Sequence, residues 1–251
     1  MIAIKSEQEI TILRANGKLL AGVLAEVAAA AREGVSTFEL DELAEQRIRE
    51  AGAEPAFKGY RGYPATLCTS INEQVVHGIP SRDRILSRGD LLSVDVGLEK
   101  DGLFVDMATT VAIGTTDPSA LRLLEITEQS LWEGISQVTM GNRLSDVSHA
   151  IGSYVEREGF YVVREYVGHG IGRKLHEDPQ IPNYGPPGQG PRLKPGMVLA
   201  IEPMVKVDPE PTKLETDDWT VTTGSGGLAA HFEHTVLVTE NDAEVLTGGG
   251  D

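Results

Sequence analysis

Residues 91–114 read LLSVDVGLEKDGLFVDMATTVAIG. Apolar residues alternate with other types on both sides of the Asp-Gly pair at 101–102, which predicts two strands joined by a hairpin turn. The alternation places Asp95 and Asp106 on one face of this hairpin. The two carboxylates lie directly opposite each other if the turn centres on 100–101, and diagonally if it centres on 101–102.

Two neighbouring carboxylates on an apolar hairpin repel each other and lose hydration, so one interpretation places a cation between them. The alternative is that both acids face solvent beside the turn. The hairpin alone does not decide between the two interpretations, so residues elsewhere in the chain are needed to decide between them.

Length, charge and cysteine content limit the possible classes of protein. The chain has 251 residues, one cysteine and a formal net charge of -16. Its length suits one large domain or two fused halves, and its composition excludes disordered and fibrous classes. The negative charge argues against a nucleic-acid backbone or an anionic membrane as partner. The single Cys68 excludes an internal disulfide and fits a reducing cytoplasm.

Helix signals come before and after the hairpin. Capping boxes begin at Ser6 and Ser36, and Asp117 followed by Pro118 begins a third helix. The apolar stretch 19–31 has helical spacing with acidic residues around it, so we expect an amphipathic helix and no targeting segment. The predicted helices run over about 7–32, 37–52, 118–141 and 145–159, the later strands over 161–165, 197–203, 219–223 and 231–239, and a long loop over 177–196.

An internal repeat relates the first half of the sequence to the second half. Glycines enclose one predicted helix at 34 and 52 and another at 141 and 159, and 141 − 34 = 107. The segments that lead from Gly89 to Asp95 and from Gly196 to Glu202 differ by the same step, since 202 − 95 = 107. We therefore expect a single domain over 1–251 with two similar halves, roughly 1–115 and 116–251, about a pseudo-twofold axis.

Four acids and one histidine share an unusual setting. Glu202 and Glu233 are single carboxylates in otherwise apolar strands, as Asp95 and Asp106 are. One such acid is often a structural hydrogen-bonding group, but four need a shared counter-ion. His169 stands between two glycines. A lone histidine is more often a structural residue than a ligand, but beside four acids the interpretation as a nitrogen ligand is the better one. This thiolate-free set suits Mn, Fe, Co, Zn or Mg, and two ions about 3.5–4 Å apart with a bridging hydroxide would support hydrolysis.

The local contexts of these residues resemble the type I methionine aminopeptidases, in their bacterial short form, of the pita-bread metallopeptidase family. The matching segments are SINEQVVHGIP (70–80), SVDVG (93–97), VDMATT (105–110), VGHGIG (167–172), LHEDP (175–179), AIEPM (200–204) and FEHTV (232–236). The resemblance implies an α+β pita-bread fold whose two related halves form a central antiparallel sheet covered by helices. It also implies a single catalytic domain that hydrolyses the N-terminal methionine from peptides and nascent proteins whose second residue is small.

The resemblance also implies roles for individual residues. Two divalent ions (Co, Mn, Fe or Zn) would be held by Asp95, Asp106, His169, Glu202 and Glu233. Asp95 would chelate one ion, Asp106 and Glu233 would bridge, and His169 and Glu202 would complete the other, with Glu202 as the general base for attack by a bridging hydroxide. The catalytic histidines would be His77 and His176. The substrate pocket would be lined by Tyr60, Tyr63, Cys68, His77, Leu175, His176, Met204 and Trp219.

Three residues depart from the pattern expected of the family. Leu175 and Phe57 stand where some relatives have Phe and Cys, and His231 is expected on the same strand face as Glu233, as a neighbour of the ligands. The implied partners are peptide N-termini of nascent chains, with transient contact to the ribosome, no nucleic acid and no membrane. The implied protein is a cytoplasmic monomer.

Other pita-bread proteins are the alternatives. A prolidase, an aminopeptidase P or a creatinase-like hydrolase carries a large N-terminal domain, whereas five residues precede the first helix cap here. Type II methionine aminopeptidases carry an inserted helical segment, but His169, Glu202 and Glu233 are close in sequence (202 − 169 = 33 and 233 − 202 = 31). A catalytically dead binding module should have lost ligands, and all five are present.

Overall fold

The structure is a computed structural model that describes residues 2–114 and 117–248. A nine-stranded sheet runs through its centre, with strands in the order β1-β4-β5-β14-β9-β7-β8, β2 pairing with β4 and β15 with β14. Every ladder between described strands is antiparallel. The strands of this sheet are β1 Glu54–Pro55, β2 Leu67–Ile71, β4 Leu91–Lys100, β5 Leu103–Ala112, β7 Gly168–Gly170, β8 Glu177–Ile181, β9 Val198–Ile201, β14 Glu233–Val238 and β15 Ala243–Val245.

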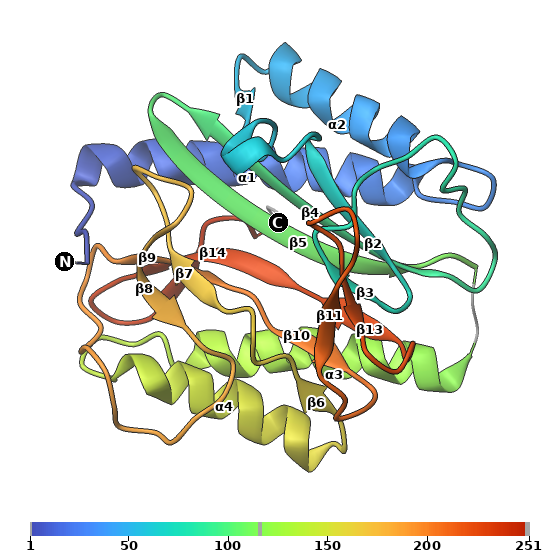
Figure 1. Cartoon of the computed structure of the whole chain (residues 1–251). Helices are drawn as coiled ribbons and strands as arrows, with labels where there is room; N and C mark the ends of the chain where they lie inside the picture. The colour runs from blue at the N-terminus through green and yellow to red at the C-terminus, as the bar shows by residue number, and fades with distance from the viewer. Residues whose placement is uncertain (1, 115–116, 249–251) are drawn as a thin grey trace.

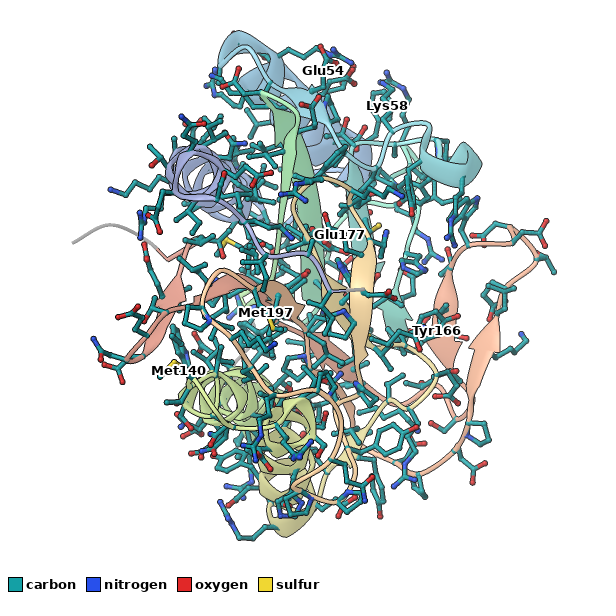
Figure 2. All side chains as sticks on the ribbon, turned by 90° about the vertical axis from the view of Figure 1, so that its left-hand side faces the viewer. Glu54, Lys58, Met140, Tyr166, Glu177 and Met197 are labelled. Carbon is teal, nitrogen blue, oxygen red and sulfur yellow. The ribbon has the colours of Figure 1, made fainter. Side chains whose placement is uncertain are left out.

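The described residues form four α-helices beside this sheet, and they are α1 Glu7–Ala30, α2 Thr37–Glu50, α3 Pro118–Ser136 and α4 Leu144–Arg157. Figure 1 shows α1 and α2 in the upper part of the molecule and α3 and α4 in the lower part. In Figure 2, α1 and α3 lie to the left of β4 and β5, and the β11–β12 hairpin lies to the right. The α+β fold class predicted from the sequence is confirmed by this architecture.

In the part of the chain that the structure describes, two small sheets lie beside the main one, with the orders β13-β10-β6 and β11-β12-β3. Their strands, with one 3-10 turn, are β3 Gln74–Val76, β6 Tyr161–Val162, β10 Met204–Lys206, β11 Thr212–Leu214, β12 Val221–Thr223, β13 Ala229–His231 and η1 Tyr60–Gly62. None of the described helices is long and apolar enough to span a membrane.

Strand alternation decides which face of the sheet is free for chemistry. Leu92, Val94 and Val96 of β4 are buried in the same apolar cluster as residues of α1 and α2. Leu199 and Ile201 of β9 are buried in a second cluster with residues of α3 and α4. Burying side chains of this size stabilises the fold by about 1.5–3 kcal/mol each. Because successive side chains point to opposite faces, the acids of these strands lie on the face away from the helices.

The central hairpin adopts the second of the two predicted registers. Lys100 pairs with Leu103, so the turn consists of two residues, Asp101 and Gly102. Both have positive φ angles, 54° and 76°, which is the type I′ geometry whose twist matches that of paired strands. Asp95 pairs with Ala108 rather than with Asp106, so the two carboxylates are diagonal neighbours on one face.

The predicted helix starts are confirmed, and some ends are corrected. Ser6 and Ser36 form the two expected capping boxes, and Asp117 accepts hydrogen bonds at the start of α3. The helix expected to reach 141 ends at Ser136, where the Asn142 side chain donates to the carbonyl of Gln137. That bond satisfies a terminal carbonyl and allows the chain to leave the helix.

Several expected strands are shorter or divided. The strand expected over 161–165 ends at Val162, and the loop expected over 177–196 contains β8. The segment 231–239 is divided at Phe232, because the chain passes there from the small sheet to the central sheet. The expectation that His231 and Glu233 share a strand face is therefore wrong, since they belong to different strands in different sheets.

Equivalent elements recur at the spacing of the sequence repeat. α2 and α4 begin at Thr37 and Leu144, and 144 − 37 = 107. β4 and β9 begin at Leu91 and Val198, and 198 − 91 = 107. The predicted boundary at 115–116 lies outside the described residues, and the division of the domain into two related halves stays a prediction.

Candidate active site

The register of the central sheet brings acids from distant segments into one row. Cys68 pairs with Asp95, Asp95 with Ala108, and Ala108 with Glu233. Directly paired residues in antiparallel strands share a face, so these four side chains lie on the face away from the helices. Glu202 follows β9 immediately and extends this row.

A second row runs parallel to the first and adds the histidine. Gly97 pairs with Asp106, Thr235 with Ala200, and Ala200 with His169. A Cβ at Gly97 would lie 2.9 Å from the Phe57 ring and 3.4 Å from Asp106 Oδ1. The small side chains between the polar ones thus leave space above the sheet for carboxylates and a shared ion.

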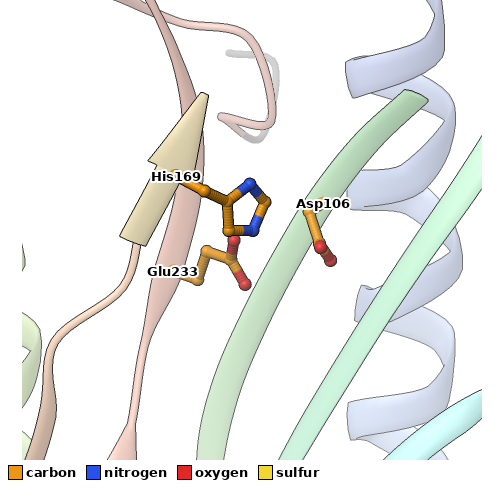
Figure 3. A group of neighbouring side chains, drawn as sticks. All are labelled: Asp106, His169 and Glu233. Carbon is orange, nitrogen blue, oxygen red and sulfur yellow. The ribbon is translucent and has the colours of Figure 1, made fainter. Parts of the chain in front are cut away.

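Among the described residues, Asp106, His169 and Glu233 form a group whose ligand atoms lie close enough together to hold one metal ion. Each contributes one ligand atom, and these atoms lie within 4.8 Å of one another. Figure 3 shows the three side chains projecting from β5, β7 and β14 into a common space. His169 Nδ1 donates to the carbonyl of Gly170 at 2.9 Å, because a carbonyl can only accept. That bond leaves Nε2 of the neutral ring free to bind a metal.

The four carboxylates face each other without a compensating cation from the described residues. Burial raises the pKa of Asp106 to about 7. Burial, followed by repulsion from neighbouring carboxylates, raises the pKa values of Asp95, Glu202 and Glu233. Asp95 Oδ1 and Glu233 Oε1 are buried and have no hydrogen-bond partner among the described residues. The donor set therefore fits hard or borderline divalent cations, which would supply the missing positive charge.

Cys68 stands beside this cluster without matching it as a ligand. It is buried, and burial followed by the charge of Asp95 raises the pKa of its thiol. A thiol with a raised pKa stays protonated, and the thiolate is the form that binds metals. Cys68 therefore belongs to the wall of the cavity.

One cavity includes all five predicted ligands and most of the predicted substrate pocket. Its lining residues are Phe57, Tyr60, Arg61, Tyr63, Cys68, His77, Asp95, Asp106, His169, Leu175, His176, Glu202, Trp219 and Glu233. Met204, predicted to line the pocket, is instead fully buried in a separate apolar cluster with Val75 and Val221. Its strand, β10, belongs to a small sheet, because β9 has already ended at Ile201.

His176 is held by an aromatic neighbour. Its Nδ1 lies 3.0 Å from the Tyr60 hydroxyl, and its ring is stacked on Tyr60 with centroids 5.2 Å apart. The ring is also 4.3 Å from that of His169. Burial, followed by the positive charge of Arg61, lowers the pKa of His176. The ring is therefore neutral at pH 7 and can both donate and accept a hydrogen bond.

His77 reaches the cavity from a different segment. Its φ of 61° is unusual for a non-glycine residue, and such conformations are concentrated at functional sites. Its ring makes edge contacts with Tyr166 and Trp219, at centroid distances of 5.5 and 6.4 Å. Burial lowers the pKa of His77 to about 4, so this ring is also neutral at pH 7.

His231 lies beside the five predicted metal ligands, which we call the ligand cluster: Asp95, Asp106, His169, Glu202 and Glu233. It does so from a different strand than the sequence predicted. Its Nε2 lies 3.7 Å from Glu202 Oε2, while His169 Nε2 lies 3.5 Å from Glu202 Oε1. The backbone of His231 is anchored at both ends by Thr110 Oγ1, which accepts from its N–H at 2.9 Å and donates to its carbonyl at 2.7 Å. Glu202 is thus flanked by two imidazoles.

Arg61 is a cavity residue that sequence reasoning missed. It has a φ of 51° and lies between two glycines of positive φ, Gly59 and Gly62. Its guanidinium lies 5.4 Å from the centre of the Tyr60 ring. The signal available in the sequence was the pair of glycines, which indicates a tight turn next to the aromatic pocket residues.

Comparison with known proteins agrees with this geometry. The model of metallopeptidase family M24 matches residues 11–240. A methionine aminopeptidase of Clostridium acetobutylicum is 51% identical over 98% of this chain and 99% of its own length, and methionine aminopeptidase 1 of Bacillus subtilis is 50% identical over the same shares. The chain therefore belongs to metallopeptidase family M24 and, within that family, to the methionine aminopeptidases.

Solved structures show the same relationship. A methionine aminopeptidase of Thermotoga maritima has a TM-score of 0.97 at 46% identity, covering 98% of this chain and 99% of that one. The prolidase of Pyrococcus horikoshii has a TM-score of 0.79 at 23% identity, and the match covers 98% of this chain but 64% of the prolidase. The chain thus has the pita-bread fold, which longer enzymes share.

Proposed function

We propose that this chain removes the N-terminal methionine from peptides and nascent proteins whose second residue is small. The observation that carries the proposal is the shared cavity, in which the four carboxylates and His169 lie beside an aromatic and apolar wall. The names of the relatives support the same activity. A cavity of this kind can hold the amine end of a peptide at metal ions while burying one side chain.

We propose that two divalent ions, from among Co, Mn, Fe and Zn, are held by Asp95, Asp106, His169, Glu202 and Glu233. Asp106 and Glu233 are assigned as shared ligands, since their ligand atoms lie close to that of His169. When bound, such ions polarise the scissile carbonyl and lower the pKa of a water molecule. The buried oxygens of Asp95 and Glu233, which have no hydrogen-bond partner among the described residues, support this assignment. The raised pKa of Cys68, the single cysteine of the sequence, supports a ligand set without a thiolate.

Glu202 is the proposed general base. Its carboxylate lies between His169 and His231, at 3.5 and 3.7 Å, so each oxygen faces an imidazole nitrogen. In this position Glu202 can take the proton that the attacking water releases and pass it to the departing amine.

The two remaining cavity histidines would hold the scissile amide. If the Tyr60 hydroxyl donates to His176 Nδ1, the neutral ring carries its proton on Nε2 and can donate to the oxygen on which negative charge develops. His77, also neutral at pH 7, would form a hydrogen bond at the nitrogen of the scissile amide. Neither ring needs to lose a proton before it can make these bonds.

The pocket chemistry suits an unbranched thioether. Tyr60, Tyr63, Leu175 and Trp219 supply apolar and aromatic walls, and the Tyr63 and Trp219 rings are packed edge to face at 5.0 Å. Phe57 narrows the same cavity from the side of Gly97. Burying a methionine side chain there contributes about 1.5–3 kcal/mol.

We further propose that the chain acts as a cytoplasmic monomer on nascent chains, with transient contact to the ribosome. We propose no nucleic-acid or membrane partner. The net charge of -16 argues against a nucleic-acid partner and against a membrane partner, because it disfavours binding to phosphate-rich surfaces.

Turnover of peptides that differ at the first two positions tests the proposed activity, with the ion content titrated in parallel. We expect Met-Ala peptides to be cleaved rapidly, Ala-Ala peptides to be cleaved much more slowly, and activity to require two divalent ions per chain. A requirement for proline at the second position, or equal cleavage after alanine, would instead indicate another activity of the same fold.

A further inference from the structure

The segment that carries Leu175 and His176 is tied to the beginning of the chain. Lys5 Nζ donates to Glu177 Oε2 at 2.7 Å, although the two residues are 172 positions apart. The side chains of Lys5 and Glu177 are 1% and 9% exposed, so this ion pair is buried. Glu177, labelled in Figure 2, directly follows His176 and begins β8.

The second oxygen of Glu177 closes the turn before His176. Oε1 accepts from the backbone N–H groups of Arg173 and Lys174 at 2.6 and 3.1 Å. The guanidinium of Arg173 in turn donates to Glu9 at 2.5 and 2.9 Å, and Glu9 belongs to the capping box of α1. We call Lys5, Glu9, Arg173 and Glu177 the N-terminal clamp. Its members connect the start of α1 to the turn that presents His176.

Two glycines leave space for the Lys5 side chain and backbone. A Cβ at Gly172, whose φ is 142°, would lie 2.3 Å from Lys5 Cε. A Cβ at Gly196, whose φ is 85°, would lie 2.7 Å from Ile4 Cγ2, and the Gly196 carbonyl accepts from the Lys5 N–H at 2.8 Å. Gly172 begins the turn to His176, so Lys5 occupies space that any other residue there would close.

We propose that Lys5 is a positioning residue for His176, acting through Glu177. This inference rests on the proposed function, in which His176 hydrogen-bonds the substrate. Without Lys5, Glu177 would lose its buried cationic partner and, among the described residues, would keep hydrogen bonds from two backbone N–H groups of its own turn. Removing one partner of a buried ion pair is strongly unfavourable. The turn would move to hydrate Glu177 and would shift His176, and a displacement of about 1 Å can lower turnover about 10²-fold.

The first test replaces Lys5 with an apolar side chain of similar length. We expect Lys5→Met to lower kcat on a Met-Ala peptide by about 10- to 100-fold, with two metal equivalents still bound. In a His176→Ala background the same substitution should change kcat less than about 2-fold, because the positioned ring is gone. An equal loss in both backgrounds would show that Lys5 acts on general stability and would overturn the proposal.

A control uses an ion pair of α1 that is more exposed than the Lys5–Glu177 pair. Arg14 holds Glu244 of β15 by two bonds of 2.6 and 2.7 Å, and neither residue belongs to the clamp or lines the cavity. Arg14→Ala should leave kcat within about 2-fold of the original value. A loss as large as that of Lys5→Met would contradict a specific role for the clamp.

A second variant tests the proposal if Lys5→Met fails to fold, and a second readout tests it if the chain lacks the proposed activity. Glu177→Gln keeps an oxygen for the two backbone N–H groups but removes the charge, and we expect a kcat loss that is again absent in the His176→Ala background. Imidazole NMR signals report on position without turnover. Lys5→Met should shift the His176 signals and leave those of His77 in place, even if the original chain does not cleave Met-Ala. Unchanged His176 signals would refute the positioning role.

Discussion

The ligand cluster and the N-terminal clamp both bury carboxylates, and they differ in how the charge is balanced. Glu177 of the clamp is paired with Lys5 at 2.7 Å and also accepts from two backbone N–H groups. In the ligand cluster, Asp95 and Glu233 each have a buried oxygen with no hydrogen-bond partner among the described residues. The chain itself balances the charge of Glu177, whereas none of the described residues balances the charge of the second group.

This difference separates a carboxylate that stabilises the fold from carboxylates that are proposed to bind a metal. A buried acid whose hydrogen bonds and counter-charge come from the chain stabilises one conformation. Buried acids that repel each other destabilise the metal-free fold, and binding a cation relieves that repulsion. Four single acids on one face of a sheet are therefore better explained by bound ions than by packing.

The largest expected effect comes from removing one charge of the ligand cluster. Asp106→Asn should abolish most turnover without unfolding the chain, because a shared ligand loses its charge while its volume is kept. Peptide turnover and ion content measure the effect, and Asp146→Asn, at the start of α4, serves as a control. Full turnover by Asp106→Asn in a metal-buffered assay would rule out a shared ligand at this position.

A smaller effect is expected at His77, which lines the cavity outside the ligand set. His77→Ala should lower kcat by roughly 10²–10⁴-fold and keep both ions, since its ring is assigned to the amide and not to the metal. Ion content by elemental analysis and kcat by peptide turnover separate the two roles. Loss of one ion equivalent would make His77 a ligand.

Metal removal should change how stability depends on pH. Burial raises the pKa of Asp106 from 3.8 to about 7, so between these values the folded metal-free chain holds a proton that the unfolded chain has released. Its stability should therefore fall as the pH rises from about 4 to 7, and bound ions should largely remove this slope. Thermal unfolding at pH 5 and pH 8, with and without chelator, measures it. A metal-free protein that is more stable at pH 8 would contradict the uncompensated cluster.

The smallest expected effect concerns the shape of the substrate side chain. Norleucine has the length of methionine without its sulfur, so peptides that begin with either residue should differ by less than about 10-fold in kcat/KM. Leucine, which is branched, should be cleaved more slowly than norleucine. Equal rates for leucine and methionine would show that Leu175 leaves the pocket too wide to select an unbranched chain.

Much of the site could be predicted from local sequence patterns. Strand alternation identified Asp95 and Asp106 as neighbours on one face, and single acids in apolar strands identified Glu202 and Glu233. The capping boxes located the starts of α1 and α2. These features depend on residues a few positions apart, so the sequence carries them directly.

Other features depend on how distant segments meet, and the sequence left them open or misplaced them. The register of the hairpin was decided by the positive φ angles at Asp101 and Gly102. Met204 does not line the cavity, and His231 and Glu233 belong to different strands, because the chain changes sheets after β9 and again at Phe232. Periodicity says which face a residue takes within a strand, but it does not say where one sheet ends and the next begins.

The sequence by itself determined the residue types of the proposed ligands, the strand faces of Asp95 and Asp106 and the helix starts, because each follows from spacing within one element. Only the tertiary structure decided that Lys5 meets Glu177, that His231 faces Glu202, and that Arg61 reaches the cavity. These residues lie in different segments, and their contacts exist because the central sheet and the segments packed around it bring those segments together. No local pattern encodes a contact across 172 residues.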